Sequence, residues 1–227
     1  MNIQLAKFLV MRHAESLEDI EKTAYERIAD KDMPLTSRGG EQARVFGTSL
    51  FQKLVSHENL HLILSPSKRV LETAVIMVSE IPAHIKWSLT TERLIAKQDW
   101  GNVTVHNRSV IERERYLAGV LRYQFPCGES GAEMLYRFNL FAEKLHRKAR
   151  SEANECTLVI THGFEFRVLL KTLLGWTEKY FESLAHPLHC EMKRLAYKNE
   201  SFILLDEMRI NDPSTNPNFV RRQQSPH

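Results

Sequence analysis

Three short, mostly apolar runs along the chain are followed at once by polar and turn-forming residues. The runs are Phe8–Met11, residues 61–64 and Leu158–Ile160, and they lead into Arg12-His13, Ser65-Pro66 and Thr161-His162-Gly163. Runs of this kind are typical of buried strands that end at the edge of a sheet. A weaker alternation predicts a short strand near 85–89, and residues 190–197 and 201–206 predict a hairpin.

Apolar residues at helical spacing fill the segments between these strands. The first helix is predicted to begin at Thr36 or Ser37, either of which can cap it. Further helices are predicted over 68–79 and 164–174, and Ser130–Glu133 forms a capping box at the start of another one. Because strands alternate with helices, we expect an α/β fold with a largely parallel sheet.

Two long segments show neither pattern. Residues 14–34 are polar and rich in Glu, Asp and Lys, and we expect a loop or a poorly packed helix over the end of the first strand. Residues 97–126 are irregular and charged, and long structured loops in compact domains are usually functional. From about 211 the chain has three Pro and few apolar residues, which predicts a disordered tail over 211–227 after one domain over 1–210.

Composition limits the class of partner. The 227 residues are 43% hydrophobic, which is ordinary for a globular domain. A net charge of +3 and a pI of about 8.7 suit an anionic small molecule, whereas no dense basic run indicates nucleic acid. Three widely spaced Cys fit a reducing compartment, and no stretch is long enough to span a bilayer. We therefore expect a cytoplasmic protein without a membrane partner.

The residues at the three strand ends are those that phosphoryl chemistry requires. Arg12, together with Arg69 one turn into the helix after the second strand, can clamp phosphoryl oxygens with paired hydrogen bonds. A neutral imidazole at His13 can act as the nucleophile, and a second one at His162 can hydrogen-bond the transferring oxygens. Gly163 lets the backbone and the N-terminus of the next helix approach an anion.

Each of these residues alone has an ordinary structural explanation. A histidine at a strand end is often a structural or surface residue, and Arg69 can be a solvated charge. Ser130 can be only a helix cap, and Trp100 can pack in the interior. The functional interpretation depends on the joint pattern, because neighbouring parallel strands would bring all three ends to one site.

Four motifs occur in a fixed order along the chain. The motif R-H-G/A-E-S matches Arg12–Ser16, and L-T-x-x-G-x-x-Q-A matches Leu35–Ala43. The motif S-x-x-x-R-x-x-x-T-A matches Ser65–Ala74, and H-G matches His162-Gly163. In order and spacing this set resembles the histidine phosphatase superfamily, in its phosphoglycerate-mutase-like branch.

Three further segments are similar to the mutase-like phosphatases of plants and fungi. They are Asp99–Asn102, Arg122–Ala132 and Thr161–Val168, and the whole resemblance spans roughly residues 8–195. It implies a three-layer α/β/α fold with a mostly parallel central sheet, no metal or other cofactor, and a small phosphomonoester as substrate. The implied catalytic residues are His13, His162, Arg12 and Arg69. We expect the substrate-binding residues to be Ser16, Asp19, Lys97, Glu129, Ser130 and Gly163.

Two positions depart from the family pattern. The family's acid is usually a Glu four residues before the Gly of the Trp-Gly pair, and here that position is Lys97. An ammonium is a poor proton donor to a leaving oxygen, although its charge could hold a second anionic group. The family often has an Asn seven residues after the first Arg, where this chain has Asp19. A carboxylate there repels phosphate unless it is protonated or turned away.

Three functions stay open at this point. The first is an active phosphatase whose leaving group departs easily, as in aryl phosphates, acyl phosphates or phosphohistidine, or is protonated by another residue. The candidate donors are Asp19, Glu92, Asp99 and Glu129. The second function is a phosphoglycerate-type mutase, in which an acid must support both half-reactions. The third is a phosphate-binding or interaction protein that kept the pocket, which Lys97 favours and the two histidines oppose.

Overall fold

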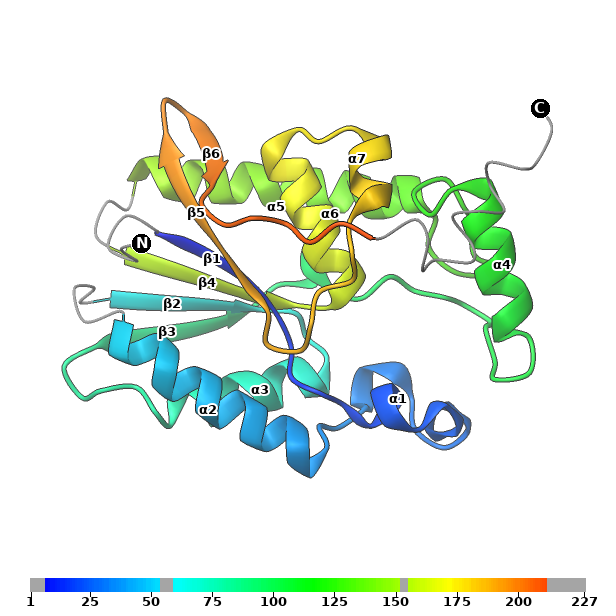
Figure 1. Ribbon diagram of the computed structural model, residues 1–227, viewed down its shortest axis with the longest axis horizontal. Helices are drawn as coiled ribbons and strands as arrows, with labels where there is room; N and C mark the ends of the chain where they lie inside the picture. Colours follow the sequence, from blue (N-terminus) through cyan, green and yellow to red (C-terminus); the bar gives the residue numbers. More distant parts are fainter. Residues whose placement is uncertain (1–6, 54–58, 152–154, 212–227) are drawn as a thin grey trace.

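A six-stranded sheet forms the centre of the computed structural model, which describes residues 7–53, 59–151 and 155–211 (Figure 1). Its strands are β1 (Phe8–Arg12), β2 (Asn59–Leu64), β3 (Lys86–Thr91), β4 (Glu155–Thr161), β5 (Met192–Lys198) and β6 (Ser201–Leu204). They lie in the order β3-β2-β4-β1-β5-β6. Strands β1 to β4 are parallel, β5 is antiparallel to β1, and β6 is antiparallel to β5. The predicted α/β class with a mostly parallel sheet is confirmed, as is the predicted hairpin.

Helices cover both faces of the sheet and complete three layers (Figure 1). Helices α2 (Ser37–Lys53) and α3 (Lys68–Val78) lie on one face, and α5 (Gly131–Ser151) and α6 (Gly163–Leu174) lie on the other. The connections contain the short elements α1 (Leu17–Ile20), η2 (Lys22–Glu26), η3 (Asp30–Asp32), η4 (Arg93–Ile95), α4 (Arg108–Ala118) and α7 (Glu178–Ser183). Within the described ranges, none of the helices combines the length and apolarity needed to cross a membrane.

Strand β1 anchors both helical layers because its side chains alternate between the two faces of the sheet. Leu9 and Met11 belong to the core that includes Phe51 of α2. Val10 belongs to the second core, with Phe138 of α5. Burying each large apolar side chain stabilises the fold by about 1.5–3 kcal/mol, so the strand that carries His13 at its end is held firmly in the middle of the molecule.

Two predicted helix ends have the expected geometry. The Ser130 hydroxyl accepts a hydrogen bond from the Glu133 amide at 3.0 Å, and the Glu133 carboxylate accepts one from the Ser130 amide at 2.8 Å. This capping box begins α5. Helix α6 ends at Gly175, whose φ of 65° lies in the left-handed region that glycine tolerates.

The prediction of an irregular segment over 97–126 is wrong in one part, because this segment contains α4. The helix buries only Ile111 on its own apolar side. Its other supports are an ion pair between Arg108 and Glu112 at 2.8 Å and the guanidinium of Arg115, which lies 4.2 Å from the ring centroid of Phe164. The helix has an apolar side, but Val110 and Leu117 on it are exposed, so burial in the core does not place this helix as it places the others.

The loop that carries α4 is closed at its base by backbone contacts. The Asn102 amide donates to the Pro126 carbonyl at 3.1 Å, and the Glu129 amide donates to the Asp99 carbonyl at 2.8 Å. Gly101 has a φ of 57°, and a Cβ there would lie 2.2 Å from the Pro126 oxygen. The two ends of this loop therefore meet directly.

The structure also describes the segment 14–34 and the first residue of the predicted tail. Residues 14–34 form the short helical turns α1, η2 and η3 with loops between them, rather than one longer helix. At the start of the predicted tail, the Asn211 side chain donates to the Leu184 carbonyl at 2.9 Å. Residues 212–227 lie outside the described part of the chain.

Candidate active site

The carboxyl ends of β1, β4 and β2 meet at one edge of the sheet. Strand β1 pairs with β4 so that Arg12 lies opposite Thr161, and β4 pairs with β2 so that Ile160 lies opposite Leu64. The residues that follow these strands therefore lie side by side, as the three apolar runs predicted. The rings of His13 and His162 meet there edge to face, with centroids 5.2 Å apart.

His13 is buried and its imidazole is oriented by its own backbone. Its Nδ1 lies 2.6 Å from the Ala14 carbonyl oxygen. Because a carbonyl can only accept, Nδ1 carries the proton and the lone pair is on Nε2. Burial lowers the pKa of His13 well below its ordinary value, and the charges of Arg69 and Arg12 lower it further. His13 is therefore a neutral imidazole with a free lone pair at neutral pH.

His162 stands at the first turn of α6 and is also neutral. Its Nε2 lies 2.8 Å from the Ser65 hydroxyl and 3.3 Å from the Ser67 hydroxyl. Burial lowers its pKa well below the ordinary value, and the nearby charges of Arg69 and Lys97 act in the same direction. The three strand ends thus contribute one imidazole each from β1 and β4 and a hydroxyl from the residue after β2.

Arg12 is held by the chain on both sides of its guanidinium. Its Nη1 donates to the Pro187 carbonyl at 2.8 Å, and its Nη2 donates to Asp19 at 2.8 Å and also lies 2.8 Å from His189 Nε2. Burial lowers the pKa of Arg12, while Asp19 and Glu18 raise it. The group keeps its charge and has a fixed orientation beside His13.

Asp19 faces Arg12 and its own helix N-terminus. Its Oδ2 accepts hydrogen bonds from the Ser16 amide at 2.8 Å and the Ser16 hydroxyl at 2.7 Å. Burial alone would raise the pKa of Asp19, but hydrogen bonds from His189 and Ser16 and the charge of Arg12 hold that pKa well below its ordinary value. Asp19 is therefore an ionised counter-ion of Arg12, with no proton to give.

Two carboxylates and two cations form a closed ring beside the histidines, and we call Glu18, Asp30, Arg69 and Lys97 the charge ring. Glu18 lies 3.5 Å from Arg69 Nε and 3.0 Å from Lys97 Nζ. Asp30 Oδ2 lies 3.1 Å from Arg69 Nη2, and Asp30 Oδ1 accepts a hydrogen bond from Lys97. The Asp30 carbonyl accepts another from Arg69 Nη1 at 2.5 Å. The ammonium of Lys97 is thus bound by carboxylates from α1 and η3.

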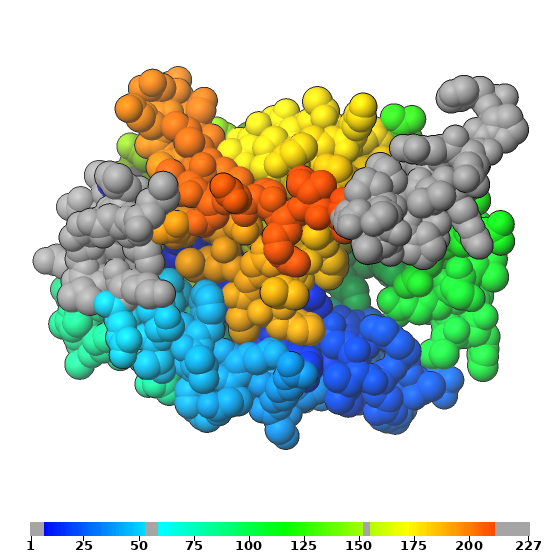
Figure 2. All heavy atoms as spheres, in the orientation of Figure 1, coloured from blue at the N-terminus to red at the C-terminus, as the bar shows by residue number. Residues whose placement is uncertain are grey.

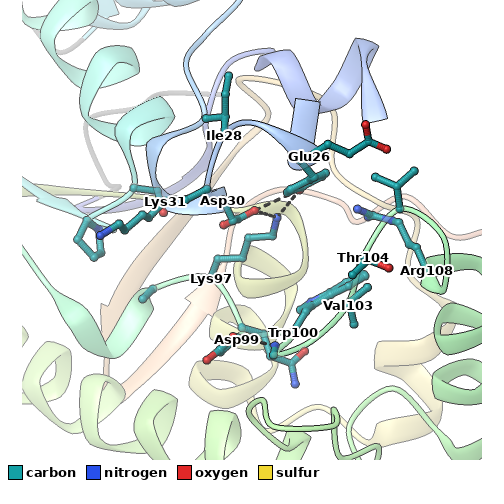
Figure 3. A pocket seen from close by; sticks show the side chains of 18 of the residues that line it. Glu26, Ile28, Asp30, Lys31, Lys97, Asp99, Trp100, Val103, Thr104 and Arg108 are labelled. Atoms are coloured by element: carbon teal, nitrogen blue, oxygen red, sulfur yellow. Dashed lines mark hydrogen bonds and ion pairs between the residues drawn. The ribbon is translucent and has the colours of Figure 1, made fainter. Parts of the chain in front are cut away.

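A cavity of about 970 Å³ adjoins the charge ring. Its wall includes Tyr25, Asp30, Ser67, Lys97, Trp100 and Arg108. Figure 3 shows Lys97 extending toward Asp30, with Trp100 and Arg108 on the neighbouring wall. In Figure 2 the surface is hollowed between the blue segment around α1 and the green segment around α4. Because Ser67 also contacts His162, the cavity reaches to within one side chain of His162.

Of the other acidic residues singled out from the sequence, Glu129 and Glu92 are bound away from the histidines, and Asp99 lies on the cavity wall. Glu129 forms a two-pronged ion pair with Arg137, with distances of 2.5 and 2.8 Å. Glu92 accepts hydrogen bonds from Lys144 at 2.7 Å and from the Leu94 amide at 3.0 Å. Asp99 lies on the cavity wall and accepts from the Gly101 amide at 2.8 Å. Ser130 serves the capping box described above. The structure therefore brings Lys97 to the histidines but places Glu129 and Ser130 in structural contacts.

Gly163 touches a residue that the sequence did not single out. A Cβ on Gly163 would lie 2.2 Å from Nε2 of His186. Burial lowers the pKa of His186 to about 3, and the charges of Arg12 and Arg167 act in the same direction. His186 is thus a neutral ring packed on the backbone at the start of α6.

Sequence reasoning also missed His189, Glu18 and Asp30. His189 lies in the loop before β5, which reaches the site because β5 runs antiparallel to β1. The close pair His186 and His189 just before a predicted strand was the available signal. No signal in the sequence indicated Glu18 or Asp30, because their partners Arg69 and Lys97 lie far along the chain.

Known proteins resemble the chain in sequence and in fold. Phosphoglycerate mutase-like protein AT74H of Arabidopsis thaliana is 30% identical over 204 residues, which are 82% of this chain and 72% of that protein. Broad-range acid phosphatase DET1 of Saccharomyces cerevisiae is 28% identical over 108 residues, 45% of this chain and 32% of that protein. The solved structure of Bacillus stearothermophilus YhfR shares the fold, with a TM-score of 0.70 and 18% identity over 90% of this chain and 97% of that chain. The family model for the histidine phosphatase superfamily (branch 1) matches residues 8–208, and the chain therefore belongs to that superfamily.

Proposed function

We propose that the chain is a phosphatase that hydrolyses a small phosphomonoester, or a similar phosphate compound, through a phosphohistidine on His13. Membership of the superfamily supports a phosphatase or a mutase. The observation that carries the proposal is the neutral imidazole of His13, whose Nδ1 is fixed by the Ala14 carbonyl and whose Nε2 keeps its lone pair. That is the state in which an imidazole attacks phosphorus.

The proposed reaction has two displacements at phosphorus. In the first, a bond forms between His13 Nε2 and phosphorus while the bond to the leaving oxygen breaks. Arg12 and Arg69 hold the phosphoryl oxygens, and His162 donates a hydrogen bond to one of them. In the second, water attacks phosphorus, and the bond to Nε2 breaks to release phosphate and neutral His13.

The leaving groups that suit this site are those that depart easily. Lys97 stands at the family's acid position, and its ammonium is already bound by Glu18 and Asp30. A phenolate, a carboxylate or an imidazole leaves phosphorus with less help from a proton than a sugar alkoxide does. We therefore expect aryl phosphates, acyl phosphates or phosphohistidine to be better substrates than alkyl phosphates.

Hydrolysis suits the surroundings of His13 better than a mutase reaction. A mutase must keep water away from its phosphohistidine until the second hydroxyl attacks. Here the large cavity beside Ser67 has several charged side chains on its wall, which favours water near the histidines. Broad-range acid phosphatase DET1, one of the relatives, is named for hydrolysis.

The test is hydrolysis of para-nitrophenyl phosphate between acidic and neutral pH. His13→Ala should lower the rate on the order of 10³-fold or more, because the nucleophile is lost. The matched control is His84→Ala, which removes an exposed histidine from the loop before β3, at the opposite edge of the sheet. His84→Ala should keep full activity.

Other outcomes would favour the other functions. Exchange of the phosphoryl group between 2- and 3-phosphoglycerate, faster than release of phosphate, would favour a mutase. A rate equal to that of His13→Ala, in a folded protein that phosphate stabilises, would favour a binding protein.

A further inference from the structure

The charge ring contains a carboxyl group that faces the cavity where a leaving group would lie. We propose that Asp30 donates the proton to the leaving oxygen and that Lys97 holds Asp30 in place for this step. The acid would thus have moved from position 97 to position 30, with the ammonium of Lys97 as its anchor. This inference rests on the proposed phosphatase activity and identifies a further catalytic residue for it.

The two carboxylates of the charge ring differ in what they face. Asp30 lines the cavity, and its side chain is 37% exposed. The Glu18 side chain is 12% exposed and is absent from the described cavity wall. Figure 3 shows the Asp30 carboxylate at the tip of Lys97, among the side chains that line the cavity. Of the two, only Asp30 has access to an oxygen on a group bound in the cavity.

Substrate binding would change the partners of Asp30. In the free protein its carboxylate and its carbonyl occupy Nη2 and Nη1 of Arg69, the atoms that a phosphoryl group would need. A phosphate dianion on Arg69 would replace these contacts and bring negative charge next to Asp30. Lys97 and the Tyr25 hydroxyl, which lies 3.1 Å from Asp30 Oδ1, would still hold the carboxyl. Asp30 would then stand between the phosphoryl group and the cavity.

Replacement of the contacts between Asp30 and Arg69 by a phosphate dianion would favour the protonated form of Asp30. In the free protein, burial raises the pKa of Asp30, but Lys97 and Arg69 outweigh burial and hold that pKa below its ordinary value. Loss of the Arg69 contact and the approach of a dianion both raise the pKa of a carboxyl group. The charged and titratable groups around Asp30 are Arg69 from α3, Lys97 after η4, Tyr25 from η2 and, across both cations, Glu18 from α1.

Asp30 would act as an acid in the first displacement and as a base in the second. As the bond between His13 Nε2 and phosphorus forms, the bond to the leaving oxygen breaks and that oxygen takes the proton from Asp30. The product is a neutral alcohol or phenol, and Asp30 becomes a carboxylate. When water attacks the phosphohistidine, Asp30 takes a proton from the water molecule. Phosphate then leaves, and Asp30 is protonated again.

The test is a series of substituted phenyl and alkyl phosphates, assayed with the wild type and with Asp30→Asn. Removal of a general acid harms poor leaving groups most, so kcat/KM for an alkyl phosphate should fall on the order of 10²-fold, with less than about 5-fold loss for 2,4-dinitrophenyl phosphate. Asp30→Glu should keep the wild-type dependence on the leaving group. Lys97→Glu in the Asp30→Asn background should restore hydrolysis of the alkyl phosphate.

Glu18→Gln is the matched control, because Glu18 contacts the same two cations from outside the cavity wall. It should lower all rates by one common factor. Equal losses across the series in Asp30→Asn, or a leaving-group dependence that appears in Glu18→Gln instead, would overturn the role of Asp30. Hydrolysis of 2,4-dinitrophenyl phosphate that persists in His13→Ala would instead overturn the phosphohistidine mechanism itself, so the two failures are distinguishable.

Discussion

His13 and His162 are buried as neutral imidazoles close to several guanidinium groups, and His186 is a third neutral imidazole there, with part of its surface exposed. The pKa of each is lower in the folded protein than in the unfolded chain. Below about pH 6.5 the unfolded chain therefore binds protons that the folded protein excludes. Their contribution to stability is complete above the unfolded pKa and is lost as the pH falls toward the folded pKa. The histidines that suit the site for nucleophilic attack also make the fold sensitive to acid.

His186 allows a direct measurement of this effect, because its pKa in the folded protein is about 3. Because the residue is partly exposed, solvent screens much of the effect, so between pH 6 and pH 4 it should lower the free energy of unfolding by well under about 1 kcal/mol per pH unit. His186→Asn should remove that part of the pH dependence, and His84→Asn, in the loop before β3 and away from the site, is the matched control. Urea denaturation at several pH values checks the prediction, and equal slopes for His186→Asn and the wild type would contradict it.

Some residues of the site could be read from the sequence and others could not. His13, His162, Arg12 and Arg69 were predictable because each follows a buried strand directly or lies one turn into the next helix. The structure brings all four together. The contact between Asp30 and Lys97 was not predictable, because an ion pair between two loops leaves no periodic pattern in either.

At the scale of elements, the strands and the long helices determine where the chemistry lies. Their apolar periodicity predicted the sheet and the four covering helices, because burial is what places them. Helix α4 escaped prediction because little of its apolar side is buried, and cation–aromatic contacts and an ion pair supply its other supports. The antiparallel return of β5 brings His186 and His189 to the site, which only the assembled sheet reveals.

Substitution of Gly163 at the start of α6 tests whether the first turn of this helix positions His162. Gly163→Ala would place a Cβ 2.2 Å from the His186 ring, so that either the ring or the first turn of α6 must move. Such overpacking costs about 1–3 kcal/mol of stability, and phosphatase activity should fall because His162 stands on the same turn. Gly40→Ala in α2 is the control, since its Cβ would lie 3.7 Å from its nearest neighbour. Thermal melts and rates for both variants test this, and full activity in Gly163→Ala would contradict it.

At the scale of the whole molecule, the site joins segments from most of the chain. The residues that follow strands β1, β2 and β4 supply the histidines and serines, while α1 and η3 supply the carboxylate counter-ions. An anion that binds the arginines and is excluded from the unfolded chain should therefore stabilise the entire fold.

The stability of the protein in increasing concentrations of inorganic phosphate tests this expectation. By mass action, phosphate at 100 times its Kd should add about 2.7 kcal/mol to the free energy of unfolding. The melting temperature should rise with phosphate concentration, and sodium chloride at equal ionic strength should not reproduce the rise. Arg12→Lys should reduce the shift, because an ammonium lacks the paired donors of a guanidinium. A shift that is the same in Arg12→Lys would place the bound phosphate elsewhere.

The loop that carries α4 leaves and rejoins the fold at one point, where Asp99–Asn102 meets Pro126–Glu129. A loop whose two ends already touch can be lengthened, shortened or exchanged at small entropic expense, since closure depends only weakly on length. Residues 103–119, which precede the buried Leu121 and Phe125, are therefore the part of this loop that can most easily be lengthened or replaced. Trp100 and Asp99 sit at its base, and Arg108 lies within it on the cavity wall. New substrates could thus be acquired by replacing one module while the histidine centre stays as it is.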